Sequence, residues 1–336
     1  MPDTLIVRLP NWLGDTVMAV PAVRALRRAR EDARLALVGP WATLLTGQQL
    51  ADVLVPYARS WTGRLGAWDE IRALGASLAV LLPNSFEAAL AARYWGASRR
   101  FGFDVGGRSR LLTDRIPPPA PRPHQIDEYA VIVEALGIRV DDRVPRLLAP
   151  PAGSEPWTTA RALLRDAGIG DTPPIGIHLG AAYGSSKLWP VERAAELCRL
   201  LAERDEIAVL LGTPHDVEMA RRIVGETGVR SLVGRDNPGM LTALLAQLGA
   251  LVCGDTGVGH LAAALGTPVV ALFGPTDARL CAPRGPARTI DHATPCAPCF
   301  YRTCPIEHPC LRGIGAREVV EALDALLAPS RAGAVR

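Results

Sequence analysis

The stretch ALVCGDTGVGH, residues 250–260, contains the pattern on which the fold depends. An apolar run at 250–253 ends in a glycine-rich turn, and a helical pattern begins at about residue 257. Such a run, without alternating polar residues, is typical of a parallel strand that is covered on both faces. Similar runs alternate with helical patterns along the chain, and this repeated βα order predicts an α/β protein built from two doubly wound units.

Two domains are expected from 336 residues, because one hydrophobic core rarely supports so long a chain. The Pro-rich segment 145–156 is a candidate linker, so we predict one domain at 1–155 and a second at 156–315. A C-terminal helix at 316–330 follows, and it is a candidate for packing back on the first domain. Ligands of doubly wound folds bind at the carboxyl ends of the strands, so we expect a central cleft between the units. The predicted strands are 4–9, 35–39, 53–56, 78–83, 99–103, 174–179, 207–211, 229–233, 250–253 and 268–273. Helical patterns between the strands include 16–30, 86–96, 190–204, 214–225, 238–248 and 257–265, and a last helix is predicted at about 316–328.

The charge distribution excludes a typical nucleic-acid binder, since the net charge is only +3. Residues 1–150 hold 19 arginines against 15 acidic residues, which favours an anionic partner or a membrane surface for that half, with scattered solvated charges as the alternative. No apolar run approaches the ~18 residues of a membrane span. The N-terminus enters a strand pattern at once, without a signal-like segment, so we expect a cytoplasmic protein.

Lys187 is the only lysine among 37 basic residues. It lies in a loop of small residues, GSSKLWP at 184–190, that follows a predicted strand and precedes a helix. A compact ammonium in such a loop is typical of phosphate binding, where arginine is not an equivalent replacement. The alternative is an exposed lysine without a function.

The glycine-rich turn predicts an anion site at the start of the following helix, whose free N–H groups attract negative charge. Asp255 and Thr256 end the strand, Gly257 opens the helix and His260 lies on its first turn. Lys187 and this helix start could therefore hold one diphosphate from two sides. The alternative makes Asp255 or Thr256 a helix cap and His260 a packed core residue.

Two carboxylates at strand ends are further candidates. Asp15 ends the segment PNWLGD at the start of helix 16–30, where it is either a general base or a helix N-cap, and Gly14 before it permits a tight turn. Asp216 follows the strand 207–211, where it is either a ribose ligand or a helix cap.

Four of the seven cysteines, Cys296, Cys299, Cys304 and Cys310, lie within fifteen residues that are rich in proline. A CxxC pair followed by two more cysteines is compatible with a structural zinc site. The irregular spacing favours a loop of reduced thiols instead, as is usual in a reducing compartment.

Several motifs, taken in order along the chain, resemble those of the ADP-heptose:lipopolysaccharide heptosyltransferases. They are NWLGD at 11–15, LPNSF at 82–86, KLWP at 187–190, DTGVGH at 255–260 and PVVALFGPT at 268–276. NWLGD, LPNSF and the cysteine segment resemble the heptosyltransferase II branch more than the heptosyltransferase I branch.

The resemblance implies a GT-B fold of two Rossmann-like domains, with an acceptor-binding N-terminal domain and an ADP-sugar-binding C-terminal domain. It implies an inverting transfer of L-glycero-D-manno-heptose from ADP-heptose to the first heptose of the lipopolysaccharide inner core, at the cytoplasmic face of the inner membrane. Asp15 then resembles the catalytic base and Lys187 the residue on the donor phosphates. The donor-binding candidates are Gly14, Lys187, Asp216, Asp255, Thr256, Gly257 and His260. No metal is demanded by this chemistry.

Three alternatives stay open at this point. A related glycosyltransferase could use another sugar donor or another glycolipid acceptor. A non-catalytic nucleotide-sugar-binding protein could share the scaffold, although a pure binder has no need of a base at Asp15. A zinc-binding interaction protein could use the cysteine segment, and the metal content of the purified protein would identify it.

Overall fold

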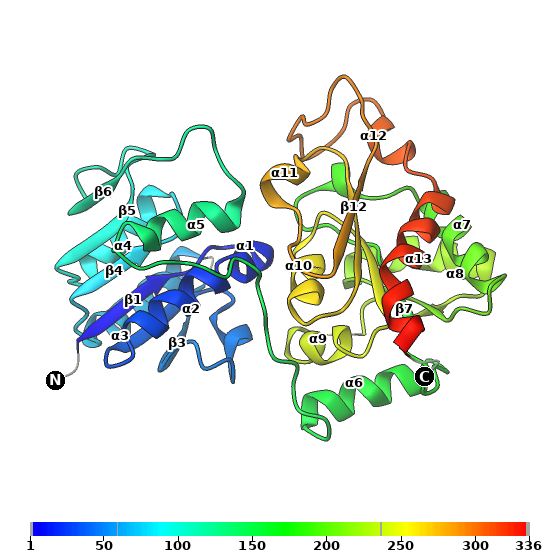
Figure 1. Ribbon diagram of the computed structural model, residues 1–336, viewed down its shortest axis with the longest axis horizontal. Coiled ribbons are helices and arrows are strands. Elements are labelled where there is room, and N and C mark those ends of the chain that lie inside the picture. The colour runs from blue at the N-terminus through cyan, green and yellow to red at the C-terminus, as the bar shows by residue number, and fades with distance from the viewer. Residues whose placement is uncertain (1–2, 59, 236, 334–336) are drawn as a thin grey trace. The chain divides into compact units, whose positions relative to one another are not determined.

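The computed structural model describes residues 3–58, 60–235 and 237–333, which form two compact units (Figure 1). Unit 1 is Met1–Pro145 and unit 2 is Arg146–Arg336. Each unit contains a six-stranded parallel sheet with helices on both faces. The predicted pair of doubly wound α/β units is therefore confirmed.

The sheet of unit 1 has the order β3-β2-β1-β4-β5-β6, so β1 lies in the interior where the order reverses. All five residues of β1 are buried, as its apolar sequence predicts for a strand covered on both faces. The edge strand β6 was not predicted, because it is short and only partly buried. The strands are β1 Thr4–Arg8, β2 Arg34–Gly39, β3 Val53–Pro56, β4 Leu78–Leu81, β5 Arg99–Phe103 and β6 Asp114–Ile116.

The helices of unit 1 form two layers. Contacts join α1, α2 and α5 in one layer and α3 with α4 in the other. The predicted helix 16–30 is in fact two helices that meet at Ala19, and the first begins earlier than expected. Ser60 and Ser85 cap α3 and α4 by accepting from the backbone of the first turn. The bounds are α1 Leu13–Met18, α2 Val20–Ala29, α3 Trp61–Ala73, α4 Phe86–Tyr94 and α5 Gln125–Glu134.

The sheet of unit 2 has the order β12-β11-β10-β7-β8-β9. Its two central strands, β10 and β7, pair in parallel, with Cys253 opposite His178 at their carboxyl ends. The apolar run at 250–253, which predicted a strand covered on both faces, therefore lies in a central strand of this sheet. The strands are β7 Ile175–His178, β8 Ala208–Leu211, β9 Arg230–Ser231, β10 Ala250–Gly254, β11 Val269–Phe273 and β12 Ala287–Asp291.

Helices also cover both faces of the second sheet. Contacts join α7 with α8 and α13 in one layer, and α6 with α9 and α10 in the other. The longer helices are α6 Glu155–Asp166, α7 Val191–Ala202, α8 Val217–Thr227, α9 Pro238–Leu245, α10 Gly257–Ala264 and α13 Ala316–Gly333, and the short ones are α11 Ala278–Cys281 and α12 Pro309–Arg312.

The boundary and the last helix differ from the prediction. The chain divides between Pro145 and Arg146, earlier than residue 155, because the backbone N–H of Leu147 already donates to Ala264 O at the end of α10. The C-terminal helix α13 belongs to unit 2, where it contacts α7, β10, β11 and β12. Its apolar side chains, among them Val319 and Leu323, complete the core of that unit.

Among the helices of the described residues, none combines the length and the apolar character that a membrane span requires.

Candidate functional site

Two loops meet at the carboxyl ends of β7 and β10. We call residues 179–190 the lysine loop and residues 254–259 the glycine loop. A side chain on Gly254 would place its Cβ 2.8 Å from the carbonyl oxygen of Lys187, so glycine is required for this close approach. The order of the two central strands thus brings together motifs that lie 68 residues apart in the chain.

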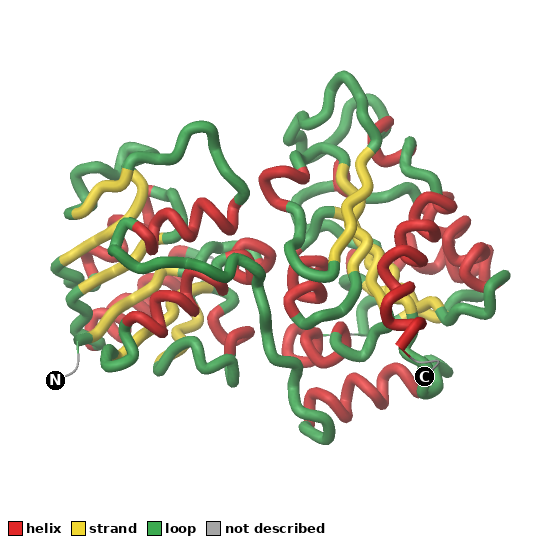
Figure 2. Tube along the Cα trace, in the orientation of Figure 1, coloured by secondary structure: helices red, strands yellow, loops and turns green. Residues whose placement is uncertain are grey.

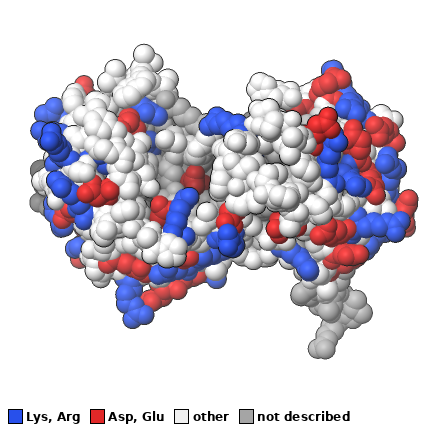
Figure 3. Space-filling view, turned by 90° about the horizontal axis from the view of Figure 1, so that it is seen from above, with Lys and Arg blue, Asp and Glu red and all other residues white. Residues whose placement is uncertain are grey.

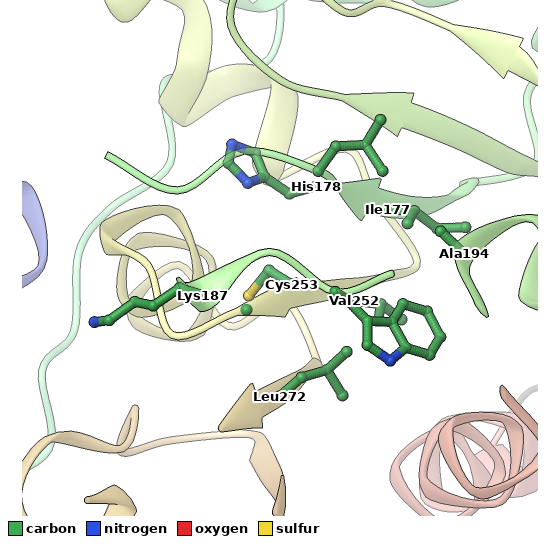
Figure 4. A pocket seen from close by; sticks show the side chains of 10 residues that line it. Ile177, His178, Lys187, Ala194, Val252, Cys253 and Leu272 are labelled. Carbon is green, nitrogen blue, oxygen red and sulfur yellow. The ribbon is translucent and has the colours of Figure 1, made fainter. Parts of the chain in front are cut away.

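Lys187 forms an ion pair with Asp255 across the two loops. The two side chains are only 10% and 8% exposed, so both charges have lost most of their hydration. Figure 4 shows the Lys187 side chain extending away from the apolar residues Val252 and Leu272, which line the adjacent pocket. The lysine is therefore a positioned charge at this sheet edge, and not the exposed residue of the alternative interpretation.

A third residue, Thr276, which the sequence analysis did not identify, binds the Asp255 carboxylate of this ion pair. Thr276 Oγ1 donates to Asp255 Oδ2 at 2.6 Å, from the segment that follows β11. Cys281 Sγ lies 3.9 Å from the same carboxylate oxygen. Because the Asp255 carboxylate is fixed from two sides, the position of the Lys187 ammonium is fixed as well.

The glycine loop leads directly into α10, whose N-cap is Thr256. Within the described part of the chain, the Thr256 side chain makes no capping hydrogen bond to this helix, and the Asp255 carboxylate is engaged by Lys187 and Thr276 instead. The first-turn N–H groups, beginning at Gly257, can then serve a ligand anion beside Lys187. His260 is 5% exposed within α10, as predicted by the alternative that makes it a packed core residue. A role for His260 in binding the ADP-sugar stays a prediction.

One glycine of this loop serves packing. A Cβ on Gly259 would lie 2.7 Å from the Cys253 sulfur. The absence of a side chain at Gly259 therefore lets α10 lie close to β10.

Asp216 adopts the capping role that was the alternative for it. Its Oδ2 accepts from Thr213 N and from Thr213 Oγ1, each at 2.8 Å, in a reciprocal capping box ahead of α8. The side chain is 8% exposed, and Gly180 and Gly212 leave the room that it occupies between the ends of β7 and β8. A ribose role for Asp216 stays a prediction.

His178 lies at the end of β7, at the same carboxyl edge of the sheet as Lys187, and its protonation state depends on its buried surroundings (Figure 4). Its Nδ1 is buried and has no hydrogen-bond partner among the described residues. Burial lowers the pKa of His178, and the Asp216 charge and a backbone hydrogen bond with Gly180 oppose this only in part. The neutral imidazole is therefore the form that the folded unit accommodates.

We expect this histidine to make unit 2 less stable in mild acid. Since the pKa of His178 is lower in the folded state, the unfolded chain takes up the proton first as the pH falls below about 6.5. The free energy of unfolding should then decrease by at most about 1.4 kcal/mol per pH unit from this group. Urea melts between pH 7.5 and 5 should show a shallower decrease for His178→Gln. The exposed His215→Gln is the matched control, and equal slopes for the parent and His178→Gln would contradict the assignment.

Unit 1 places Asp15 in the first turn of α1, at the carboxyl end of β1. The N-cap of this helix is Trp12, so the N-cap interpretation of Asp15 is wrong. Gly14 is the buried second residue of α1, and it is not the tight-turn residue that we predicted. Tyr129, a buried residue of α5, interacts electrostatically with Asp15. Burial is the main cause of the raised pKa of Tyr129, and the negative charges of Asp15 and Glu128 raise it further. A half-buried carboxylate at a strand end has the setting that a general base requires.

Two buried arginines support this edge of unit 1. Arg8 donates to Asn11 Oδ1 at 2.7 Å and so holds the loop between β1 and α1. Burial lowers its pKa to about 10, against the opposing charge of Glu87. Arg108 donates to Asn84 Oδ1 at 3.1 Å, and Asn84 Nδ2 in turn donates to Glu128 at 3.3 Å. The LPNSF segment thus connects β4, through Asn84, with α5.

The cysteine segment, residues 292–310, has no regular secondary structure as far as residue 308 (Figure 2), and Cys310 lies in the short helix α12. No group of three or more His, Cys, Asp or Glu side chains in the described ranges is arranged to hold a metal ion. The four candidate cysteines, Cys296, Cys299, Cys304 and Cys310, are free, and they range from exposed Cys296 to buried Cys310. A structural zinc site at these four cysteines stays a prediction.

The chain is similar in sequence and fold to several known proteins. Residues 64–309 match the family described as glycosyltransferase family 9 (heptosyltransferase). Lipopolysaccharide heptosyltransferase 2 of Escherichia coli is 30% identical over 296 residues, which cover 81% of this chain and 83% of that protein. The solved structure of E. coli ADP-heptose lps heptosyltransferase II matches with a TM-score of 0.80 at 26% identity over 98% of this chain and 99% of that one. A family 9 glycosyl transferase from Veillonella parvula shares the fold, with a TM-score of 0.82 at 21% identity over 97% of both chains.

Proposed function

This chain belongs to glycosyltransferase family 9, the heptosyltransferases, and from that premise we propose that it is an inverting enzyme that transfers L-glycero-D-manno-heptose from ADP-heptose to the first heptose of the lipopolysaccharide inner core. The buried Lys187–Asp255 pair beside the N-terminus of α10 is the observation that carries the proposal. It concentrates an ammonium and free backbone N–H groups at one sheet edge, which is what a diphosphate leaving group requires.

The donor is bound in unit 2. The Lys187 ammonium has three N–H donors, of which Asp255 takes one, so the others can bind phosphate oxygens. The N–H groups at the start of α10 complete the anion site with their dipole. Both groups stabilise the negative charge that develops on ADP as the bond between the anomeric carbon and the diphosphate breaks.

The acceptor is bound in unit 1, where Asp15 acts as the general base. It removes the proton from the acceptor hydroxyl while that oxygen attacks the anomeric carbon on the face opposite to ADP, which inverts the configuration. The proton passes to the Asp15 carboxylate, and the electron pair of the broken bond leaves with ADP. We propose that no metal takes part, because Lys187 and the helix N-terminus supply the positive charge.

We place the enzyme in the cytoplasm, at the inner surface of the inner membrane, with no nucleic-acid partner. The excess of arginine in residues 1–150 favours an anionic glycolipid acceptor. Basic and acidic side chains are interspersed on the face shown in Figure 3, so we expect only a moderate electrostatic attraction of the protein to an anionic membrane surface. Peripheral association of this kind should weaken as the ionic strength rises.

The direct test is a mass-spectrometric assay with ADP-heptose and a truncated lipopolysaccharide that carries one heptose. We expect the acceptor to gain the mass of one heptose for each ADP released, with the same rate in the presence of EDTA. Transfer only from another nucleotide sugar, or only to another glycolipid, would support the alternative glycosyltransferase. Binding of ADP-heptose without any transfer would contradict the enzymatic assignment.

A further inference from the structure

The cysteine segment is attached to the lysine loop along its backbone. Three consecutive carbonyl oxygens accept hydrogen bonds from that loop: Phe300 O from Tyr183 Oη at 2.6 Å, Tyr301 O from Ser186 Oγ at 2.5 Å, and Arg302 O from Ser186 N at 3.1 Å. Ser186 is 2% exposed, so its two hydrogen bonds are shielded from water. The path of residues 300–302 is therefore set by the loop that carries Lys187.

Two further features fix the same path. Gly184 has a φ of +155°, and a Cβ at this position would lie 2.3 Å from the carbonyl oxygen of Arg302, so only glycine allows the two segments to approach so closely. On the other side, Phe300 N donates to Pro275 O at 2.8 Å. Pro275 precedes Thr276, which binds Asp255. The segment is thus held between the two loops that position the Lys187–Asp255 pair.

This attachment brings a second cation to the candidate diphosphate site. The Arg302 guanidinium lies 5.3 Å from the centre of the Tyr183 ring, and Lys187 Nζ lies 4.6 Å from the centre of the same ring. A ring face attracts both cations and orients them. Tyr183 therefore places the guanidinium and the ammonium in one neighbourhood, although 115 residues of sequence separate them.

Lys187 and Arg302 differ in whether a carboxylate is paired with them. Lys187 is paired with Asp255, so the pair as a whole carries no net charge. Arg302 is exposed, and in the part of the chain that the structure describes no carboxylate lies within ion-pair distance of it. Its guanidinium is therefore available to an external anion, and its planar fork suits two phosphate oxygens.

We propose that Arg302 is a second phosphate-binding residue of the donor site, held beside Lys187 by Tyr183 and by the attachment of residues 300–302. The inference rests on the proposed function and specifies which residues contact the diphosphate. It also gives the cysteine segment a role that needs no metal, since the segment carries the arginine.

Calorimetric titration with ADP tests the proposal without an acceptor. Arg302→Ala should weaken ADP binding by about tenfold or more, because a charge-assisted contact is lost. Arg302→Lys should recover part of the loss, since it keeps the charge but not the fork. The exposed Arg312→Ala, which removes a surface pair with Glu307, is the matched control and should bind ADP like the parent.

The possible results separate two questions. A parent protein that binds ADP while Arg302→Ala binds it equally well would overturn this inference and leave the proposed function intact. An equal loss in Arg302→Ala and Arg312→Ala would also overturn it, because the effect would then be one of general surface charge. A parent that binds no ADP at all would contradict the proposed function, and the inference with it.

Discussion

Asp15→Asn is expected to reduce the turnover of heptose transfer by roughly 10²–10⁴, which is the range that general base catalysis contributes. The amide keeps the size of the carboxylate and its place in the first turn of α1, but it cannot accept the proton of the acceptor hydroxyl. Because Asp15 belongs to unit 1 and the proposed donor site to unit 2, the affinity for ADP should stay near that of the parent. Single-turnover assays of ADP release, with calorimetric titration of ADP, measure both quantities.

The control for this variant is Asp32→Asn, which removes an exposed carboxylate from the same unit. It should transfer heptose at the parental rate. A purified Asp15→Asn protein with parental turnover would show that another group accepts the proton.

Lys187→Ala is expected to weaken ADP-heptose binding and to reduce the rate of transfer by about 10²–10³, the loss found when one group that stabilises developing charge is removed. The effect on catalysis exceeds that of a surface charge, because the side chain is 10% exposed and its field is little screened. Steady-state kinetics should show a higher KM for ADP-heptose together with a lower kcat. Unchanged values for both would exclude Lys187 from the donor site.

The same substitution should also reduce stability, and a double-mutant cycle separates the two effects. Removal of one partner of a buried pair leaves the other charge uncompensated and costs ~3–5 kcal/mol in the free energy of unfolding. Lys187→Ala combined with Asp255→Ala should recover a large part of that stability while remaining inactive. Recovery of activity in the double variant would mean that Lys187 serves only to neutralise Asp255.

The central strands could be predicted because burial on both faces imposes continuous apolar sequence, as in β1 and β10. The edge strands β6 and β12 escaped prediction, since each is covered in part and mixes charged with apolar residues. The helices α3, α5 and α6 escaped as well. The sequence of α3 contains two glycines and mixes exposed with buried aromatic residues, which weakens the helical pattern.

The candidate site could be predicted only in part. Lys187 and Asp255 each carry a local signal, a lone lysine and a strand-end glycine loop, but their ion pair depends on the pairing of β7 with β10. Thr276 and Arg302 are joined to these residues by contacts between distant segments, which no local pattern specifies. The sequence signals that could have pointed to them are the GPT motif at 274–276 and an aromatic residue, Tyr183, just ahead of the lysine.

The composition of the chain allows the opening of the Lys187–Asp255 ion pair to be measured by chemical labelling. Lys187 is the only lysine, so its amine is the single side-chain amine that reductive alkylation can modify. The amine reacts only when it is released from Asp255 and exposed to solvent, and in the structure it is neither. The labelling rate of the unaltered protein therefore reports how often this pair opens, and a bound nucleotide should slow that rate.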